Sequence, residues 1–297
     1  MSKEVVVRDG IADGARDEQV MTRMLRAHRY PEVNRCIYCG ECVVEGGLTD
    51  EHIVPHSIGG ALVLPKASCR ECAKVTAAVE GSFAGQALRP VRRQFKFPHK
   101  SRGRAARQAR EAERFPIRMN GRTYALEASL VPPLLMSFVY EPPSALWGGT
   151  TDGPIVGRVI MRDLPGFHRK SADLEKRSRN RKFGYLVRES AAVTARVLAK
   201  IAHTYAIAEL GTDAFRPCLL PFLSDAEGTG IGTYVGSAIP NVEGDFPIGQ
   251  DLHNVSIDDA DLGRRRLVVV RVQLWACFGF PVHLVVVGDV NQGASKS

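Results

Sequence analysis

The chain has 297 residues, of which 44% are hydrophobic, so it can bury a core in one large domain or two smaller ones. This composition excludes a disordered protein. The net charge of +8 and the pI near 9.2 favour a polyanionic partner. The sequence opens without a signal peptide, and no apolar run approaches the length of a membrane span. We therefore expect a cytoplasmic protein with no membrane partner.

The first predicted element is a short helix within an N-terminal segment, residues 1–33. Apolar residues recur at helical spacing between Asp17 and His28, and Pro31 then breaks the pattern.

Two Cys-x-x-Cys pairs follow, Cys36/Cys39 and Cys69/Cys72. Two cysteines three residues apart converge on one ion, so the four thiols can close a tetrahedral Zn²⁺ site. Five of the seven cysteines fall between Cys36 and Cys72, which indicates thiolate ligation in a reducing compartment and not a disulfide framework. Cys42 could substitute for Cys39, but we interpret it as a bystander.

The zinc module is predicted to span residues 34–88 in the order β, β, α. We expect strands over Leu48–Val54 and Ala61–Leu64, separated by a turn at Ser57–Gly60. A helix is expected over Cys69–Phe83. A unit of this size is too small to fold alone, so zinc would clamp its ends.

Glu51 and His52 lie between the two cysteine pairs. A neutral imidazole is a suitable base near pH 7, and a carboxylate can hold a hard cation such as Mg²⁺. Neighbouring residues of a regular strand point to opposite faces. For Glu51 and His52 to share one site, the backbone must bend there, with which Pro55 nearby is compatible.

Four stretches together resemble a known family: Cys36-Ile-Tyr-Cys39-Gly, Leu48-Thr-Asp-Glu-His52-Ile-Val-Pro55, Gly59-Gly60 and Ser68-Cys69-Arg-Glu-Cys72. Over residues 36–80 the chain is similar to zinc-containing HNH endonucleases of the ββα-metal nuclease superfamily. The resemblance implies DNA cleavage with one catalytic divalent metal, Mg²⁺ or Mn²⁺. It also implies that His52 is the general base and that Glu51 is a ligand of the catalytic metal.

One position departs from the family pattern. Zinc-bearing relatives commonly place Asn directly after the second cysteine pair, where the oxygen of its side chain completes the metal site, but Ala73 stands there. Thr76, Glu80 and His56 are possible replacements. We favour His56, which follows the motif turn and could bind metal or phosphate.

Residues 89–116 form a predicted basic connector with no core of its own, including an exposed helix over Arg102–Phe115. Twelve Lys or Arg residues against two Glu lie between Arg89 and Arg122, and a second basic run covers Arg169–Lys182. Clustered cations of this kind favour nucleic acid. DNA is the expected partner, with RNA also open, and the expected contacts are Arg89, Arg92, Arg93, Lys96, Lys100, Arg102 and Arg104.

A C-terminal α+β domain of unassigned function is predicted over residues 117–290, followed by a frayed tail, 291–297. Asn120-Gly121 between two strand-like runs is typical of a two-residue hairpin. The fold class expected for the whole chain is therefore α+β, with a small ββα-metal module followed by a larger mixed domain.

The clearest predicted helix of this domain spans Val187–Leu210, and its His203 lies one step off the apolar face. We interpret His203 as satisfied or exposed and not as a ligand. Two strands are expected near the end of the chain, over Arg266–Cys277 and Val282–Val287.

The leading functional hypothesis is a metal-dependent DNA endonuclease that hydrolyses phosphodiester bonds. A second is a catalytically degenerate zinc module that binds nucleic acid without cutting it, with Ala73 as the sign of the lost site. A third is a zinc-stapled protein-interaction domain. The sequence leaves the oligomeric state open.

Overall fold

The computed structural model describes residues 27–41, 46–85, 88–95, 97, 114–119, 122–127, 130–164, 167–177, 183–185, 190–224, 228–239, 246–263 and 265–291. Its mixture of helices and separate sheets is the expected α+β class. Most of the predicted N-terminal helix, residues 17–26, lies outside these ranges. Its expected last residue, His28, belongs to a strand instead, because it pairs with Leu62.

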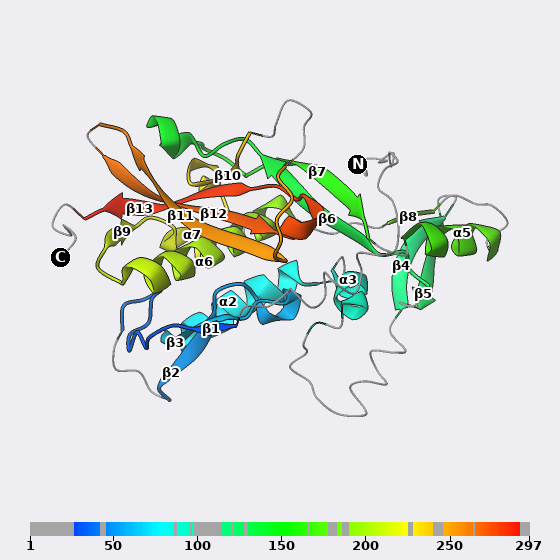
Figure 1. Cartoon of the computed structure of the whole chain (residues 1–297), viewed down its shortest axis with the longest axis horizontal. Helices are drawn as coiled ribbons and strands as arrows, with labels where there is room; N and C mark the ends of the chain where they lie inside the picture. The colour runs from blue at the N-terminus through cyan, green and yellow to red at the C-terminus, as the bar shows by residue number, and fades with distance from the viewer. Residues whose placement is uncertain are drawn as a thin grey trace.

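The N-terminal module has the predicted ββα order, at the bottom of Figure 1. Its sheet has the order β1-β3-β2, in which β1 pairs parallel and β2 antiparallel with β3. Strand β3 is longer than the sequence predicted, because it continues directly into the helix. The elements are β1 (His28–Arg29), β2 (Leu48–His52), the 3-10 helix η2 (His56–Ile58), β3 (Leu62–Cys69) and α2 (Arg70–Phe83).

The bend expected near Glu51 lies on the opposite strand. The β2–β3 register shifts between the pairs Thr49↔Ser68 and Glu51↔Leu64, so three residues of β3 face one residue of β2. Pro65 opens this bulge, since it has no N–H to donate to the ladder, and Lys66 adopts φ 48°. Strand β2 therefore remains regular up to His52.

Two glycines shape the turn after β2. A Cβ on Gly60 would lie 2.0 Å from the carbonyl oxygen of Val54, so no larger residue fits there. Gly59 has φ 94°, and a side chain on it would press against Phe97 and Leu252. The Gly59-Gly60 pair thus allows the turn to pack tightly against distant parts of the chain.

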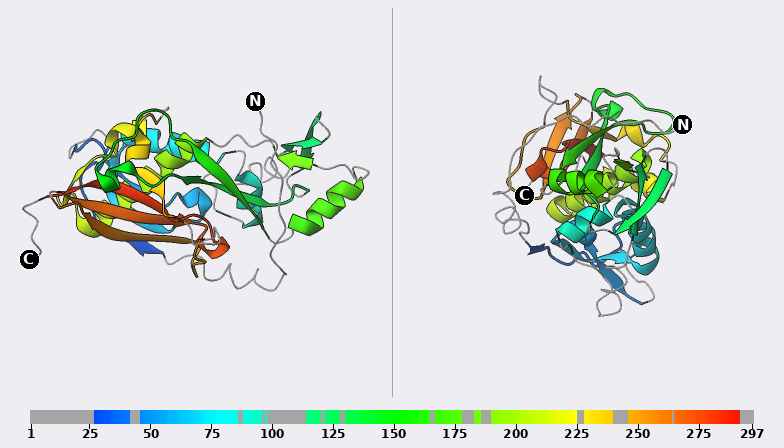
Figure 2. Two further views of the ribbon diagram at one scale, coloured as in Figure 1. Left: turned by 90° about the horizontal axis from the view of Figure 1, so that it is seen from above. Right: turned by 90° about the vertical axis from the view of Figure 1, so that its right-hand side faces the viewer.

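Helix α6 (Ala191–Leu210) is the central layer of the molecule. It is apolar nearly all round, which is typical of a buried helix, and most of its residues are shielded from solvent. The zinc module lies against one side, where α2 contacts α6, and a sheet formed near the C-terminus lies against the other. Figure 1 and the right-hand view of Figure 2 show these layers. The helix begins later than the predicted Val187.

The C-terminal sheet contains both strands predicted near the end of the chain. Its order is β10-β13-β12-β11, with β9 pairing at the far end of β13. Strand β13 extends beyond the predicted end at Val287, because its last residues pair with β9. The elements are β9 (Phe215–Pro217), α7 (Leu220–Ser224), η4 (Ile231–Thr233), β10 (Val235–Ser237), β11 (His253–Asp261), β12 (Arg266–Leu274), η5 (Ala276–Phe278) and β13 (His283–Val290).

The stretch from residue 114 to residue 185 forms a further group of elements, part of which extends to the right in Figure 1. The predicted hairpin is present, with Met119 paired to Arg122 across residues 120–121. The helix expected over Arg102–Phe115 is wrong at its end, since Arg114 and Phe115 pair in a strand; residues 102–113 lie outside the described part. The elements are β4 (Arg114–Met119), β5 (Arg122–Glu127), β6 (Leu134–Tyr140), η3 (Ser144–Trp147), β7 (Gly157–Asp163), α5 (Phe167–Arg177) and β8 (Phe183–Tyr185).

One hydrophobic core crosses the predicted boundary between the zinc module and the rest of the chain. It joins Ile53 and Ile58 of the module to α6 and to the C-terminal sheet. The predicted connector also contributes, because helix α3 (Arg89–Gln94) carries buried Val91, and Phe95 and Phe97 follow it. The predicted connector, which was expected to have no core of its own, thus packs at its start into the core shared by the module and α6.

Two buried histidines of the C-terminal sheet predict acid sensitivity. Burial lowers the pKa of His283 to about 3 and that of His253 to about 4, so the native state keeps both neutral. The unfolded chain protonates them near pH 6.5, so their stabilising contribution is present above about pH 6.5 and is lost as the pH falls towards about 4. The free energy of unfolding should decrease over this window.

We expect His283→Gln to reduce the slope of this decrease by about one proton, roughly 1.4 kcal/mol per pH unit. Denaturant unfolding at a series of pH values measures the slope. His168→Gln is the control, since the side chain of His168 is 64% exposed. An unchanged slope in His283→Gln would contradict the assignment.

Candidate metal centre and active site

The four cysteines predicted to bind zinc lie together. The Sγ atoms of Cys36, Cys39, Cys69 and Cys72 all lie within 4.8 Å of one another. Tetrahedral zinc with Zn–S bonds of about 2.3 Å separates its sulfurs by about 3.8 Å, and Cys39 and Cys69 are 3.9 Å apart. The donor set therefore fits a structural Zn²⁺ ion. Cys42 lies outside the described residues.

Local hydrogen bonds shape both cysteine pairs. The N–H of Gly40 donates to the carbonyl of Cys36, closing a tight turn around the first pair. In the second pair, Sγ of Cys69 accepts from the N–H of Cys72 at the start of α2. Burial alone would raise the pKa of the Cys36 thiol, but backbone N–H groups of Cys69, Cys39 and Tyr38 lower it to about 7. The surroundings of Cys36 therefore favour the thiolate that zinc requires, whereas burial raises the pKa of Cys39 and Cys72.

The first prediction for the site concerns zinc. Cys69→Ser should lose the ion and lower the melting temperature, because the ion joins the loop before β2 to the start of α2. Cys218→Ser is the matched control: Cys218 lies outside the cluster and donates to the carbonyl of Val286, which a hydroxyl can also do. Metal analysis of the purified proteins measures zinc. Retention of one zinc per chain in Cys69→Ser would contradict the assignment.

Glu51 contacts a residue that sequence analysis did not single out. Its carboxylate is 7% exposed, and Oε1 lies 2.7 Å from Nζ of Lys200 in the middle of α6. Oε1 of Glu80, on α2, lies 2.8 Å from the same nitrogen, an ion pair without hydrogen-bond geometry. Nζ also donates to the main-chain carbonyl of His52. Lys200 thus joins β2, α2 and α6 at one point.

The ammonium of Lys200 is 1% exposed and remains charged. Burial lowers its pKa, but the negative charges of Glu51 and Glu80 outweigh burial and raise the pKa above its ordinary value. A buried ammonium without a counterion would be strongly unfavourable. The two carboxylates therefore neutralise Lys200, and Glu51 faces an ammonium and not open space. In this arrangement the residues around Glu51 do not fit a divalent metal.

Lys200→Met should lower the free energy of unfolding by about 3–5 kcal/mol, because it leaves buried carboxylates without a counterion. Lys74→Met is the control. Lys74 pairs with Glu71 on the surface of α2 and is 65% exposed, so its loss should change stability by less than about 1 kcal/mol. Denaturant melts of the two variants test the contrast, and equal effects would contradict the role of Lys200.

His52 and His56 lie side by side at the end of β2. Their ring centroids are 5.0 Å apart. His52 is half-buried, whereas His56, on η2, is exposed. Burial lowers the pKa of His52 below its ordinary value, and the nearby His56 and Lys200 lower it further. The structure therefore presents a neutral imidazole next to a second, solvent-facing one.

Neither helix residue proposed to replace the missing Asn offers a free ligand. The hydroxyl of Thr76 donates to the carbonyl of Ala73 within α2, and Glu80 contacts Lys200. His56 is the one candidate of the three that faces solvent. It lies with His52 and not with Glu51, which is turned towards α6.

The predicted nucleic-acid contacts have different outcomes. Arg92 instead supports the fold, since its guanidinium donates to the carbonyls of Ser57 and Ala84. Arg89 is exposed on α3, and Arg93 lies on the same helix. The remaining four, Lys96, Lys100, Arg102 and Arg104, lie outside the described residues.

Two buried histidines also connect the module to the rest of the chain. Nε2 of His203, on α6, lies 2.9 Å from the carbonyl oxygen of Ile37, so the predicted structural role of His203 is consistent with this contact. Nε2 of His253 lies 3.0 Å from the carbonyl oxygen of Ile58.

The sequence-based predictions missed Lys200. A lysine between Val197 and Ile201 on a buried stripe signals a need for an anionic partner.

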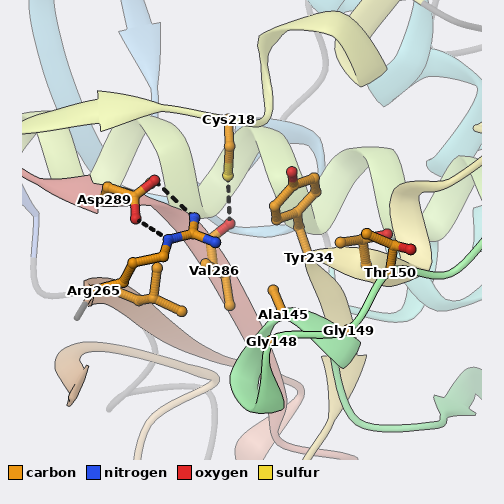
Figure 3. A pocket seen from close by; sticks show the side chains of 12 residues that line it. Ala145, Gly148, Gly149, Thr150, Cys218, Tyr234, Arg265, Val286 and Asp289 are labelled. Atoms are coloured by element: carbon orange, nitrogen blue, oxygen red, sulfur yellow. Dashed lines mark hydrogen bonds and ion pairs between the residues drawn. The ribbon is translucent and has the colours of Figure 1, made fainter. Parts of the chain in front are cut away.

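A small surface pocket between η3 and the C-terminal sheet offers less chemistry. Its volume is about 90 Å³, and Figure 3 shows Arg265 held by both carboxylate oxygens of Asp289, at 2.8 and 2.9 Å. Burial raises the pKa of the Cys218 thiol there to about 12, so this cysteine is a poor nucleophile. We therefore assign no activity to the pocket.

The fold defines a ββα module with four cysteines placed to bind zinc and a histidine at the end of its second strand. Residues 36–84 match the family model of the HNH endonucleases, which confirms the resemblance over this segment. No curated protein and no solved structure matches the chain. Among the described helices, none is long and apolar enough to cross a membrane.

Proposed function

We propose that the protein is a DNA endonuclease in which His52 is the general base. The observation that carries this proposal is the position of His52: a half-buried, neutral imidazole at the end of β2, next to exposed His56, inside a segment that matches the HNH endonucleases. Hydrolysis of a phosphodiester requires a base to activate water, and a neutral imidazole can take that proton.

His56 is proposed as a second catalytic residue. Its ring lies 5.0 Å from that of His52 and faces solvent, where a phosphate could approach both rings. An N–H of the imidazole could donate a hydrogen bond to a phosphate oxygen as negative charge develops there. Exposed Arg89 on α3 and the basic residues around it would hold the DNA backbone without reading its sequence.

The cofactors of the proposal are Zn²⁺ on the four cysteines and a catalytic Mg²⁺ or Mn²⁺, as the resemblance implies. The zinc would hold the module together. The second ion would neutralise charge on the phosphate, but Glu51 could ligate it only after Lys200 had left the carboxylate. A cytoplasmic location would keep the cysteines reduced, and none of the described cysteines forms a disulfide.

Supercoiled plasmid DNA tests the proposal, incubated with zinc-loaded protein in Mg²⁺, Mn²⁺ or EDTA. We expect wild-type protein to nick the plasmid and His52→Ala to lose at least about 100-fold in rate, since a general base contributes typically 10²–10⁴-fold. His168→Ala is the control, because His168 is exposed on α5, away from the module. Equal nicking by wild type and His52→Ala would overturn the proposal.

One observation favours a second candidate, a zinc module that binds nucleic acid without cutting it. Lys200 contacts Glu51, and Ala73 brings no ligand, so the metal site of a nuclease is incomplete as it stands. This candidate predicts DNA binding that weakens steeply with salt, because bound cations release counterions, together with no nicking under any metal condition.

A further inference from the structure

Four oxygen atoms surround Nζ of Lys200. Carboxylate oxygens of Glu51 and Glu80 lie at 2.7 and 2.8 Å. The carbonyl oxygen of His52 accepts a hydrogen bond from Nζ, and that of Ile53 lies 3.4 Å away. Carboxylates and main-chain carbonyls are the ligands that hard divalent cations prefer. The environment of this ammonium is therefore also a suitable environment for a metal ion.

The oxygens come from β2, the residue that follows it and α2, whereas Lys200 belongs to α6. Glu51 and the two carbonyls belong to β2 and the residue after it, whereas Glu80 lies on α2. Both elements belong to the zinc module, so they would remain together if the lysine were replaced. Lys200 comes from the opposite layer, 120 residues beyond Glu80 in the numbering (200 − 80). The module thus builds the oxygen site, and the rest of the chain supplies the cation.

We propose that Lys200 is a covalently attached cation that occupies a latent divalent-metal site formed by Glu51, Glu80 and the carbonyl oxygen of His52. No role was expected for Lys200 from the sequence, and Glu80 was named only as a possible replacement for the missing Asn. The proposed occupant after removal of the lysine is a hard divalent cation, for which Mn²⁺ is the probe. Lys200 would thereby control whether a metal ion reaches the active site of the proposed endonuclease. This regulatory role rests on the proposed function.

The geometry makes the two cations mutually exclusive. A divalent ion bound to the same oxygens at about 2.0–2.6 Å would lie almost where Nζ now lies. The two positive charges would repel each other at contact, in a region with little water to screen them. The side chain of Lys200 is 1% exposed, so little water is available to solvate its ammonium away from these oxygens. An ion can therefore enter only when the ammonium leaves.

Mn²⁺ titration of zinc-loaded protein, without DNA, tests this competition. The electron paramagnetic resonance signal of free Mn²⁺ reports binding, and the thiolates are expected to retain zinc because Mn²⁺ is the weaker competitor. We expect Lys200→Met to bind one Mn²⁺ at least about tenfold more tightly than wild type, because an occupied site reduces the apparent affinity by the fraction that is free. Mn²⁺ should also raise the melting temperature of Lys200→Met.

Three further variants define the site. Adding Glu51→Gln or Glu80→Gln to Lys200→Met should each abolish the gained Mn²⁺ binding, since each removes a carboxylate ligand. Lys74→Met should bind Mn²⁺ as wild type does, because Lys74 pairs with Glu71 on the outer surface of α2. Equal affinities of wild type and Lys200→Met would overturn the proposal, as would gained binding that survives Glu51→Gln.

A comparison without Lys200→Met covers the case in which that variant does not fold. Wild-type protein should show no Mn²⁺ binding that Glu51→Gln removes, and tight wild-type binding lost in Glu51→Gln would overturn the proposal. Nicking that depends on His52 is measured separately. If nicking depends on His52 and wild-type protein also binds Mn²⁺ tightly through Glu51, the proposed function is retained and the role of Lys200 is rejected. If no such nicking occurs and wild-type protein shows no Mn²⁺ binding through Glu51, only the nuclease is rejected.

Discussion

The charge of one buried ammonium constrains the whole structure. Lys200 lies in the middle of an apolar helix, so its counterions must be brought to it by other elements. Glu51 arrives on β2 and Glu80 on α2, and the carbonyl of His52 completes the arrangement. A shift of any one of the three elements would leave a charge buried without a partner. The zinc module is therefore held in one orientation on α6.

Three other side chains also hold the module in place by hydrogen bonds to its main-chain carbonyls. His203 meets the carbonyl of Ile37 near the first cysteine pair, and His253 meets that of Ile58 on the turn after β2. Arg92 reaches the carbonyl of Ser57 on the same turn. Carbonyls that would otherwise be buried without partners are thus satisfied by side chains from distant parts of the chain. These contacts fix the turn that carries His56 beside His52.

The sequence was sufficient where a structure depends on local spacing. The cysteine pairs predicted the zinc cluster, and the segment around His52 predicted the ββα order, because both patterns lie within about 50 residues of one another. It was insufficient where contacts are distant. Lys200 meets Glu51 across 149 positions (200 − 51), and no local pattern indicates which carboxylate a buried lysine will find. The bulge also lay on β3 and not at Glu51, because Pro65 interrupts the partner strand.

The continuous core has a consequence for how such a module can move between proteins. Ile53 and Ile58 pack into the same core as α6, and residues just beyond the module, including Phe97, cover the turn at Gly59. A recombination event that transferred residues 34–88 alone would carry the four cysteines and His52. It would also expose this apolar surface and leave Glu51 and Glu80 without their counterion. The folding unit is therefore larger than the motif, because a host chain that received residues 34–88 alone would have to supply the apolar surface and the positive charge that α6 supplies here.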